Sequence, residues 1–542
     1  MVGRRADVLT VPATVEMARK LTRLSVKHNL KIDPRVSQLF DAIPRETWLP
    51  GFNFTLKPYQ AEGVAWLESQ LGTGLLADEQ GTGKTVQITA YAHKNQLFPM
   101  CVTLPNTLKL NWRNEIIAMT GSQYRVNVVG HSYGKRQTAL RAQRHPNVIY
   151  SKTPTPGCDI YLVNYDILSA NVEAMEELGL KLLVLDESHK IKNPDARRTQ
   201  AFLRLATGEV EEKLPGGKRV TRKVGKPVPR VVLMSGTPMV NRPAELWTTV
   251  RSLASYVPQF STWTKFAWRF CNPVNNGHGW NFSGSSNMSE LHQLLTQHLM
   301  LRRLKQDVLK ELPPKVYRVI PLEFERAEYD RVERAFQGLD WKGGLEAMIQ
   351  MGANAPKSDE RIVAIQKLRE VAALSKLAST VEWIRDYTEN GEKLVVFAHN
   401  RAVIDHIRGA LEADQEWGGK VGVIFGGVSN EERVEAVERF QKDPNTRVIL
   451  VGITAGGFGL TLTAARAVAF VQTPWSPGEL HQAADRVHRI GQDADQVTIY
   501  NLVAENTIEE LMADMLFSKG QVLDAGLDGG AVVNTVDLRA AG

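Results

Sequence analysis

Three side chains near the end of the chain have the types and spacing to bind a phosphate group. The segment 481–492 reads His-Gln-Ala-Ala-Asp-Arg-Val-His-Arg-Ile-Gly-Gln, which places Gln482, Arg486 and Arg489 at i, i+4 and i+7. In a helix these positions share one face. Two guanidinium groups neutralise and orient phosphate oxygens through their forked N–H donors. The segment therefore predicts a phosphate-binding helix face.

A helix start lies immediately upstream of this face. Ser476 suits the N-cap, Pro477 suits the first helical position, and Glu479 would complete a capping box. The competing interpretation is an exposed charged helix with internal ion pairs, such as Asp485 with Arg489. Four further phosphate and nucleic-acid signals upstream favour the phosphate-binding interpretation.

A phosphate loop occupies residues 78–85, which read Asp-Glu-Gln-Gly-Thr-Gly-Lys-Thr. The strict pattern has glycine where Asp78 stands, but the end that contacts phosphate is intact. Glycines let backbone N–H groups approach the phosphates, and the following helix presents its positive N-terminal end. Lys84 would reach the β- and γ-phosphates, and Thr85 would hold Mg²⁺. The predicted nucleotide-binding residues of this loop are Gly81, Thr82, Gly83, Lys84 and Thr85.

An acidic pair, Asp186 and Glu187, follows a predicted strand at 181–185. Ligands of parallel sheets bind at the carboxyl ends of the strands. We expect Asp186 to bind Mg²⁺, usually through water, and Glu187 to orient and deprotonate an attacking water molecule. His189 would link this site to neighbouring motifs. An acidic helix start is the alternative, and the phosphate loop about 100 residues upstream favours the catalytic interpretation.

Two shorter motifs fit beside this site. The segment 56–60, Leu-Lys-Pro-Tyr-Gln, could place Gln60 against an edge of adenine. The segment 235–238, Ser-Gly-Thr-Pro, ends the next strand, and the hydroxyls of Ser235 and Thr237 could couple the nucleotide state to the rest of the lobe. The same tetrapeptide also reads as a turn.

Nucleic-acid contacts are predicted at turns that follow strands, because backbone N–H groups there bind phosphates well. The glycine-rich turn 454–461 would also allow close approach of a backbone or a phosphate. The segment 213–230 holds seven Lys or Arg residues and no acid. It could be a protruding hairpin or loop that follows a duplex backbone, or a solvated insertion. The predicted DNA-binding residues are Pro105, Asn106, Thr107, Asn164, Thr454, Gly456 and Gly457.

Bulk properties set the class of protein. A chain of 542 residues is too long for one core. The composition, 43% hydrophobic and 23% charged, is that of a soluble globular protein, and the net charge of +7 fits a polyanionic partner. The three cysteines show no metal-ligand spacing and suggest no disulfide framework, which favours a reducing cytosol. No membrane span and no secretory signal are expected.

The order of apolar runs predicts an α/β protein with two parallel sheets. Several of the runs are hydrophobic throughout, as in strands buried on both faces. The first series lies at 100–104, 159–163, 181–185 and 231–234; the second lies at 393–397, 421–425, 448–451, 468–471 and 497–501. We expect a small basic helical N-terminal region at 1–50, lobe 1 at 51–305, a helical linker region at 306–390, lobe 2 at 391–520 and a flexible tail at 521–542. The basic helices at the N-terminus could contact DNA or present a solvated face while they pack.

Taken in this order and spacing, the motifs resemble those of superfamily 2 helicases, and more narrowly the Swi/Snf-type double-stranded DNA translocases. The Asp-Glu-Ser-His run at 186–189 and the run at 485–492 are specific to that group. The segments 235–246, 279–287 and 300–309 are similar to the HARP-like annealing-helicase branch, whose members rewind DNA and remodel stalled forks. The resemblance covers roughly residues 50–520. We find no zinc-finger or nuclease motif, and the compact core suits a bacterial, archaeal or phage protein.

The resemblance implies two RecA-like lobes with ATP and Mg²⁺ in the cleft between them. Arg486 and Arg489 would then reach the γ-phosphate as arginine fingers when the lobes close. It also implies a DNA-dependent ATPase that moves along double-stranded or branched DNA as a monomer. A cytoplasmic location is expected in a bacterial or phage-infected cell, and a nuclear one in a eukaryote. Three alternatives stay open: a strand-separating helicase, a remodeller that strips proteins from DNA, and a DNA-binding scaffold with a relic ATP site.

Overall fold

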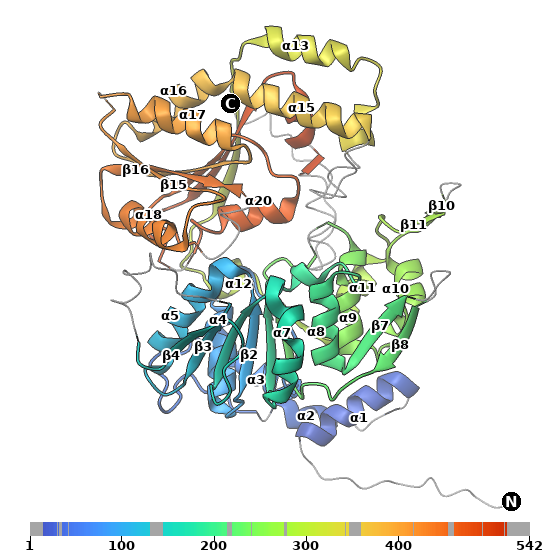
Figure 1. The fold of residues 1–542 in the computed structure, drawn as a ribbon. Helices are drawn as coiled ribbons and strands as arrows, with labels where there is room; N and C mark the ends of the chain where they lie inside the picture. Colours follow the sequence, from blue (N-terminus) through green and yellow to red (C-terminus); the bar gives the residue numbers. More distant parts are fainter. Residues whose placement is uncertain are drawn as a thin grey trace, which may run out of the picture.

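Two parallel sheets, each covered by helices, make up the computed structural model (Figure 1). The structure describes residues 15–29, 31, 35–41, 43–130, 145–213, 219–239, 241–275, 279–341, 343–345, 359–415, 417–453, 460–489, 491–513 and 515–516. Within this part of the chain no helix is long and apolar enough to span a bilayer. The predicted tail and the residues Thr454, Gly456 and Gly457 lie outside the described residues.

Lobe 1 is built on an eight-stranded sheet in the order β12-β1-β9-β6-β2-β5-β3-β4, with every neighbouring pair parallel. The four strands predicted here are present as β2, β5, β6 and β9. The strands are β1 Thr73–Leu76, β2 Met100–Leu104, β3 Val126–Val129, β4 Val148–Ser151, β5 Ile160–Asn164, β6 Leu182–Asp186, β9 Val231–Met234 and β12 Met300–Leu301. The covering helices are α3 Pro58–Ser69, α4 Lys84–Lys94, α5 Lys109–Thr120, α7 Tyr165–Glu177, α8 Arg197–Thr207, α9 Trp247–Ala254, α10 Trp263–Phe270 and α11 Met288–His298.

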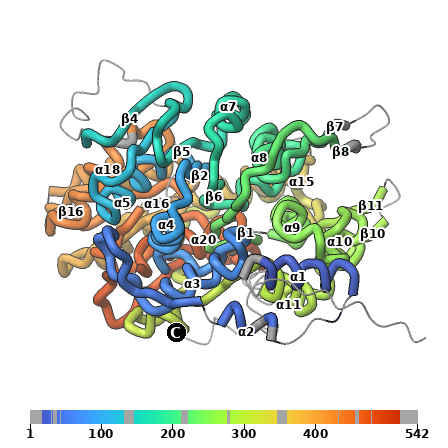
Figure 2. Tube along the Cα trace, turned by 90° about the horizontal axis from the view of Figure 1, so that it is seen from below, coloured from blue at the N-terminus to red at the C-terminus, as the bar shows by residue number. Residues whose placement is uncertain are grey.

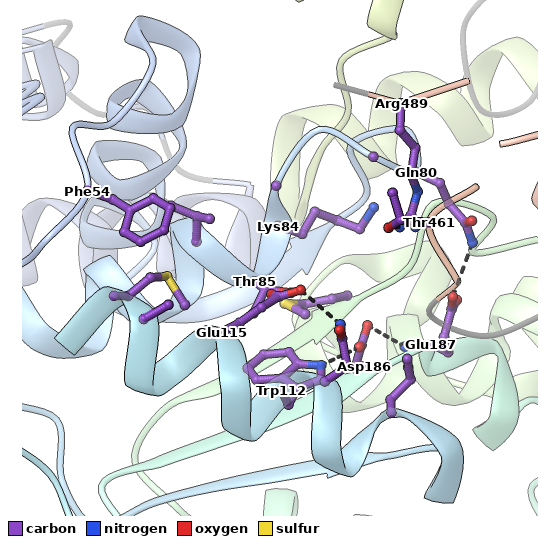
Figure 3. A pocket seen from close by; sticks show the side chains of 18 of the residues that line it. Phe54, Gln80, Lys84, Thr85, Trp112, Glu115, Asp186, Glu187, Thr461 and Arg489 are labelled. Carbon is purple, nitrogen blue, oxygen red and sulfur yellow. Dashed lines mark hydrogen bonds between the residues drawn. The ribbon is translucent and has the colours of Figure 1, made fainter. Parts of the chain in front are cut away.

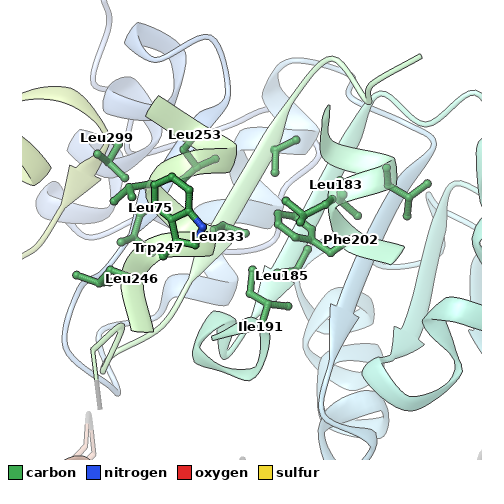
Figure 4. Packing of buried hydrophobic residues seen from close by; sticks show 14 of the residues in the cluster. Leu75, Leu183, Leu185, Ile191, Phe202, Leu233, Leu246, Trp247, Leu253 and Leu299 are labelled. Atoms are coloured by element: carbon green, nitrogen blue, oxygen red, sulfur yellow. The ribbon is translucent and has the colours of Figure 1, made fainter. Parts of the chain in front are cut away.

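Leucines of the central strands form the core of lobe 1 (Figure 4). Leu75 of β1 and Leu185 of β6 lie on the face that packs against Phe202 of α8 and Trp247 of α9. The opposite face packs against α3, α4 and α5. Because both faces are covered, the strands are apolar throughout, and their carboxyl ends are held in one rigid edge.

Lobe 2 is built on a six-stranded parallel sheet in the order β13-β18-β17-β14-β16-β15. The five strands predicted for this lobe are all present. The strands are β13 Lys315–Leu322, β14 Leu394–Ala398, β15 Lys420–Ile424, β16 Thr446–Gly452, β17 Ala467–Phe470 and β18 Val497–Ala504. The helices from α12 onward are α12 Lys305–Val308, α13 Arg326–Ala335, α15 Glu360–Ser375, α16 Leu377–Thr388, α17 Arg401–Glu412, α18 Asn430–Lys442 and α20 Pro477–Ala484.

The sequence predicted a helical linker region at 306–390, but this region also contains a strand. Strand β13 lies within it and pairs with β18 over eight residues, from Lys315 beside Val497 to Leu322 beside Ala504. Only Leu322 of the eight residues of β13 is buried, and the strand lacks the continuous apolar run that marks the other strands of this sheet. An edge strand has one open side, and its pattern is correspondingly weaker. The second sheet therefore begins directly after residues 303–314, which connect the lobes and which we call the linker.

Two hairpins and two N-terminal helices are added to lobe 1. Strand β7, Glu209–Lys213, pairs antiparallel with β8, Arg219–Lys223, and β10, Val274–Asn275, pairs with β11, Trp280–Asn281. The basic segment at 213–230 thus contains a strand that lies opposite an acidic one, with Glu209 beside Lys223. Glu209 and Lys223 are therefore cross-strand neighbours of opposite charge in this hairpin.

The N-terminal helices α1 Val15–His28 and α2 Arg35–Asp41 lie on the underside of lobe 1 (Figure 2). The Arg19 guanidinium lies 5.5 Å from the centre of the Phe40 ring, and that of Arg23 lies 5.6 Å from the centre of the Tyr256 ring. These arginine side chains therefore pack against aromatic rings of the protein. Of the two interpretations of this region, the structure therefore favours a packing helix.

Candidate active site

The phosphate loop connects β1 to α4 and owes its shape to two glycines. Gly81 and Gly83 have φ values of 84° and 81°, in the left-handed region that glycine adopts without strain. A Cβ atom at Gly81 would lie 3.1 Å from Arg489 Cγ and 3.3 Å from Lys305 Cε. Gly81 therefore permits the close approach of lobe 2 as well as the turn itself.

Lys84 begins α4 and points into the loop. Its ammonium donates to the carbonyl oxygens of Asp78, at 2.8 Å, and Glu79, at 3.2 Å. Burial lowers the pKa of Lys84, and the carboxylates of Glu187, Asp78 and Asp186 oppose this effect. The side chain is thus held where a phosphate bound by the loop would meet it.

Gln60 contacts the loop from α3. Its side-chain carbonyl accepts from the Lys57 backbone N–H at 3.0 Å, and its amide donates to the Thr82 carbonyl at 3.1 Å. Tyr59 donates to the same carbonyl oxygen at 2.7 Å. The predicted nucleotide-binding glutamine is therefore next to the phosphate loop.

Asp78, which replaces the usual glycine, has a structural partner far along the chain. It is fully buried, and Arg303 donates to both of its carboxylate oxygens, at 3.0 Å and 2.5 Å. Gln87 of α4 donates to it at 3.1 Å, and the Arg303 guanidinium also stacks on Tyr59. A paired, hydrogen-bonded carboxylate is the form in which a buried charge is tolerated. Asp78 thus ties the start of the loop to the linker.

The acidic pair lies at the carboxyl end of β6, as predicted. The Trp112 indole N–H of α5 donates to Asp186 Oδ2 at 2.8 Å, and the Glu187 backbone N–H donates to Oδ1 at 3.0 Å. Glu187 has a φ of 56°, a strained value for a non-glycine residue. Burial, and next the neighbouring Asp186 charge, raise the pKa of Glu187 to about 7. A carboxylate with a raised pKa is a stronger base.

The predicted coupling residues form a chain from Glu187 to lobe 2. Ser235 Oγ lies 3.4 Å from Glu187 Oε2, and His189 Nδ1 lies 3.4 Å from both of these atoms. The Thr237 backbone N–H donates to Ser235 Oγ at 3.1 Å. Gln482 of α20 then donates to Thr237 Oγ1 at 2.6 Å. Polar contacts therefore connect the acidic pair to the predicted phosphate-binding face.

The helix that was predicted to carry Gln482, Arg486 and Arg489 is shorter than expected. Helix α20 ends at Ala484, so both arginines lie in the turns that follow it. Ser476 is the N-cap and accepts from the Glu479 N–H at 3.3 Å. Glu479 itself accepts from the Trp475 N–H at 3.3 Å, so the capping box is not formed as predicted.

The irregular backbone of this segment is set by Asp485. The carboxylate of Asp485 pairs with Lys305 and Lys315, not with Arg489 as the alternative interpretation supposed. The Arg489 side chain instead donates to the Asp485 backbone carbonyl at 3.1 Å and to Thr461 Oγ1 at 3.1 Å. Tertiary contacts thus end the helix before the arginines, yet both reach the same cavity.

Both lobes line one cavity of about 390 Å³ (Figure 3). This volume lies in the range of roughly 300–1,000 Å³ that small-molecule sites occupy. The predicted residues that line it are Gly81, Gly83, Lys84, Thr85, Asp186, Glu187, Arg486 and Arg489. Thr85 and Asp186 offer the hard oxygen ligands that Mg²⁺ prefers, and Mg²⁺ commonly needs only one or two protein ligands beside substrate phosphates. The residues present therefore fit a nucleotide with its metal ion.

The cavity residues that sequence reasoning missed include Gln80, Trp112 and Glu115. The Gln80 amide donates to Glu187 Oε1 at 3.1 Å, and Trp112 fixes Asp186 as described above. Glu115 lies beside Thr85 (Figure 3), and burial raises its pKa. The Trp-x-x-Glu spacing of residues 112–115 places both side chains on one face of α5. That spacing was the available signal, but it becomes informative only once α5 is known to line the cavity.

The predicted DNA-binding residues of lobe 1 lie at strand ends but differ in their surroundings. Pro105 is buried, and Asn106 is exposed at the start of a short 3-10 helix before α5. Asn164 is the N-cap of α7, and its side-chain oxygen accepts from the buried Lys109 ammonium at 2.6 Å. Of these residues Asn106 presents its side chain to solvent, whereas that of Asn164 is held within the protein.

Comparison with known protein families decides the class. The SNF2-related domain matches residues 59–209 and 227–367, and the helicase conserved C-terminal domain matches residues 374–491. The chain belongs to the SNF2-related family. The break in the first match, between 209 and 227, coincides with the β7–β8 hairpin. The predicted resemblance and the predicted two-lobed α/β fold are confirmed, and the two matched domains indicate an ATP-hydrolysing enzyme of helicase superfamily 2.

Two curated relatives cover most of the SNF2-related chain. DNA annealing helicase and endonuclease ZRANB3 of Homo sapiens is 30% identical over 525 residues, which are 93% of this chain and 43% of that protein. SWI/SNF-related matrix-associated actin-dependent regulator of chromatin subfamily A-like protein 1 of Xenopus tropicalis is 32% identical over 483 residues, 87% of this chain and 45% of that protein. The chain thus spans less than half the length of these relatives.

A solved structure was also found, the Sulfolobus solfataricus SWI2/SNF2 ATPase core in complex with dsDNA. It is 23% identical, with a TM-score of 0.38, and the match covers 89% of this chain and 96% of that chain.

Proposed function

We propose that the chain is a DNA-dependent ATPase that couples hydrolysis of ATP to movement along double-stranded DNA, and that it remodels or anneals branched DNA. One observation supports the proposal above all. Lys84, Asp186 and Glu187 of lobe 1 line the same cavity as Arg486 and Arg489 of lobe 2. Neither lobe holds a complete site, so a change in the spacing of the lobes would switch hydrolysis on or off.

The residues of lobe 1 bind and activate the reactants. Lys84 would neutralise the β- and γ-phosphates, while Gly81 and Gly83 expose backbone N–H donors. Thr85 and Asp186 would hold Mg²⁺, which shields the phosphate charge when bound. Glu187 would accept a proton from the water molecule that attacks the γ-phosphorus, as the bond from that phosphorus to the β-phosphate oxygen breaks.

The residues of lobe 2 would act on the charge that develops during hydrolysis. Arg486 and Arg489 present guanidinium groups to the cavity, and arginine fingers contribute about 10³–10⁵ in rate in related phosphoryl-transfer enzymes. Gln482 would report the state of the site through Thr237 and Ser235 to Glu187. The coupling role of His189 belongs to the same chain of contacts.

The DNA partner is proposed from the family and from the relatives. Both curated relatives are about 30% identical across nearly all of this chain, and one is named as a DNA annealing helicase. We propose that backbone N–H groups at the strand ends near Asn106 and Thr107 bind DNA phosphates, and that the chain acts on DNA as a monomer. DNA bound across both lobes would favour the closed arrangement, so hydrolysis would depend on DNA.

The test is a comparison of ATP hydrolysis without nucleic acid and with single-stranded DNA, duplex DNA, forked DNA and RNA. Strong stimulation by duplex or forked DNA is expected, and Lys84→Ala should abolish it. Strand displacement and strand annealing are then scored separately on the same forked substrate. Stimulation by single strands or RNA alone would instead indicate a strand-separating helicase, and hydrolysis that no nucleic acid changes would contradict the proposal.

A further inference from the structure

The linker between the lobes runs directly beside the catalytic cavity. At its beginning, the Glu79 backbone N–H in the phosphate loop donates to the Arg303 carbonyl at 3.0 Å. Near its end, the Pro313 carbonyl oxygen lies 2.7 Å from Nε2 of the His488 ring. His488 stands between the two arginine fingers in the sequence. The linker therefore contacts both halves of the site before the second sheet begins.

Four charged side chains, two of them buried and two partly buried, lie where the linker passes between these two segments. Lys315 Nζ is 2.7 Å from Asp485 Oδ1 and 3.3 Å from Glu79 Oε1. Lys305 Nζ is 2.9 Å from Asp485 Oδ1 and 3.8 Å from Glu79 Oε1. Lys305 and Asp485 are only 2% and 3% exposed. We call this set, Glu79, Lys305, Lys315 and Asp485, the linker quartet.

The linker quartet is balanced within each lobe as well as between them. Glu79 and Lys305 belong to the lobe 1 side, where the Lys305 backbone N–H also donates to Glu79 Oε2 at 2.8 Å. Lys315 and Asp485 belong to lobe 2, on β13 and at the end of α20. If the lobes separate, each charge keeps an opposite charge on its own side. Breaking a buried ion pair is costly because it leaves a buried charge without a partner. This arrangement avoids that cost when the lobes separate.

The quartet also sets the position of the arginine fingers. Asp485 immediately precedes Arg486, and its backbone carbonyl accepts from the Arg489 guanidinium. The Lys305 ammonium donates to the His488 carbonyl at 2.6 Å, within the same segment. Burial alone would raise the pKa of Asp485, but Lys305 and Lys315 outweigh it and hold that pKa well below its ordinary value. Asp485 is therefore charged at neutral pH and bound to both lysines.

We propose that Lys305 and Lys315 are positioning residues for ATP hydrolysis, which clamp the linker onto Glu79 and Asp485 and so fix the arginine fingers opposite the phosphate loop when the lobes close. The proposal rests on the hydrolytic function proposed above. The lysines do not touch the reacting atoms in this scheme. They determine how often, and how accurately, Arg486 and Arg489 reach them.

The experiment compares Asp485→Asn and Lys305→Met with the wild-type chain in duplex-stimulated ATP hydrolysis. A displacement of catalytic groups by about 1 Å can cost roughly 100-fold in rate, so we expect kcat to fall by about ten- to 100-fold. Binding of a fluorescent ATP analogue should change by less than about threefold, because Lys84 and Gln60 are untouched. Lys315→Arg retains the charge and should keep most of the activity.

Two further measurements separate positioning from mere support of the fold. If the quartet acts through the fingers, adding Arg489→Ala to Asp485→Asn should cost much less than Arg489→Ala costs alone. Glu311→Gln is the matched control, because Glu311 forms an exposed ion pair between the linker and Lys57 of lobe 1; this change should leave kcat and the melting temperature as they are.

The outcomes are distinguishable from a failure of the proposed function. No hydrolysis by the wild-type chain with any nucleic acid would overturn the function itself. Wild-type hydrolysis with full activity in Asp485→Asn would overturn the positioning proposal alone. Additive losses in the double variant would also overturn the positioning proposal. So would a fall in kcat and in nucleotide affinity that is proportional to the fall in melting temperature.

Discussion

The amide of Gln482 in lobe 2 donates a hydrogen bond to the hydroxyl of Thr237 in lobe 1, with 2.6 Å between Nε2 and Oγ1. This contact crosses the cleft and continues through Ser235 to Glu187. It therefore gives a physical route by which the position of lobe 2 affects the residue proposed to activate water.

Removal of this hydrogen bond should weaken the coupling between the lobes. The net contribution of one hydrogen bond is roughly 0.5–1.5 kcal/mol, which corresponds to about a two- to tenfold change in rate. We therefore expect the DNA-stimulated kcat of Gln482→Ala to fall by this factor. Thr237→Val should give a similar loss, and the double variant no more than either. Gln441→Ala is the control, since Gln441 bonds to Thr463 and Ala464 within lobe 2. Additive losses would show that the two residues act separately.

Glu187→Gln should abolish turnover and leave ATP binding intact. The amide keeps the shape of the side chain and an oxygen that can accept from Gln80, but it cannot take a proton from water. The measurements are steady-state hydrolysis and equilibrium binding of a fluorescent ATP analogue. Normal hydrolysis in this variant would remove Glu187 from the catalytic role.

The raised pKa of Glu187 predicts how the rate depends on pH. Burial, with the Asp186 charge, raises that pKa to about 7, and the deprotonated form is the base. Below this pH the base form is lost, so kcat at saturating ATP and DNA should fall by about tenfold per pH unit. Far-ultraviolet circular dichroism over the same range checks that the chain stays folded. A rate that stays constant down to about pH 5.5 would contradict the role of Glu187 as a base with a raised pKa.

Arg489→Ala should lower kcat by about 10³ and leave nucleotide affinity nearly unchanged, because a finger acts mainly on the transition state. Arg401→Ala serves as the control, since Arg401 forms an exposed pair with Asp405 within α17. A single-turnover measurement separates the chemical step from product release. A loss of affinity without a loss of kcat would show that Arg489 only binds the nucleotide.

Asp78→Asn should destabilise lobe 1, since it leaves the largely buried Arg303 charge partly unpaired. Breaking a buried ion pair from one side costs about 3–5 kcal/mol, and urea unfolding followed by tryptophan fluorescence measures the change. Asp405→Asn, at an exposed pair, should cost less than about 1 kcal/mol. Equal stability of the two variants would mean that Asp78 does not anchor the linker.

The chain by itself determined the local chemistry of the site. Three features could be predicted from the sequence: the glycines of the phosphate loop, the acidic pair after β6 and the continuous apolar strands. Each reflects the backbone conformation or the burial of a short segment, which depends mainly on neighbouring residues in the sequence. Nine predicted strands are present in the two sheets for that reason. The origin of the protein and the DNA contacts at Thr454, Gly456 and Gly457 stay predictions.

Tertiary structure decided what depends on partners far along the chain. The periodicity predicted one helix through Arg489, but Lys305 and Lys315 capture Asp485 and the helix ends at Ala484. The departure at Asp78 is explained by Arg303, 225 residues later. Trp112 and Glu115 gain meaning only because α5 lies beside β6 and its acidic pair. Long-range ion pairs and packing depend on which residues come together where the lobes meet. Local residue patterns do not predict these contacts.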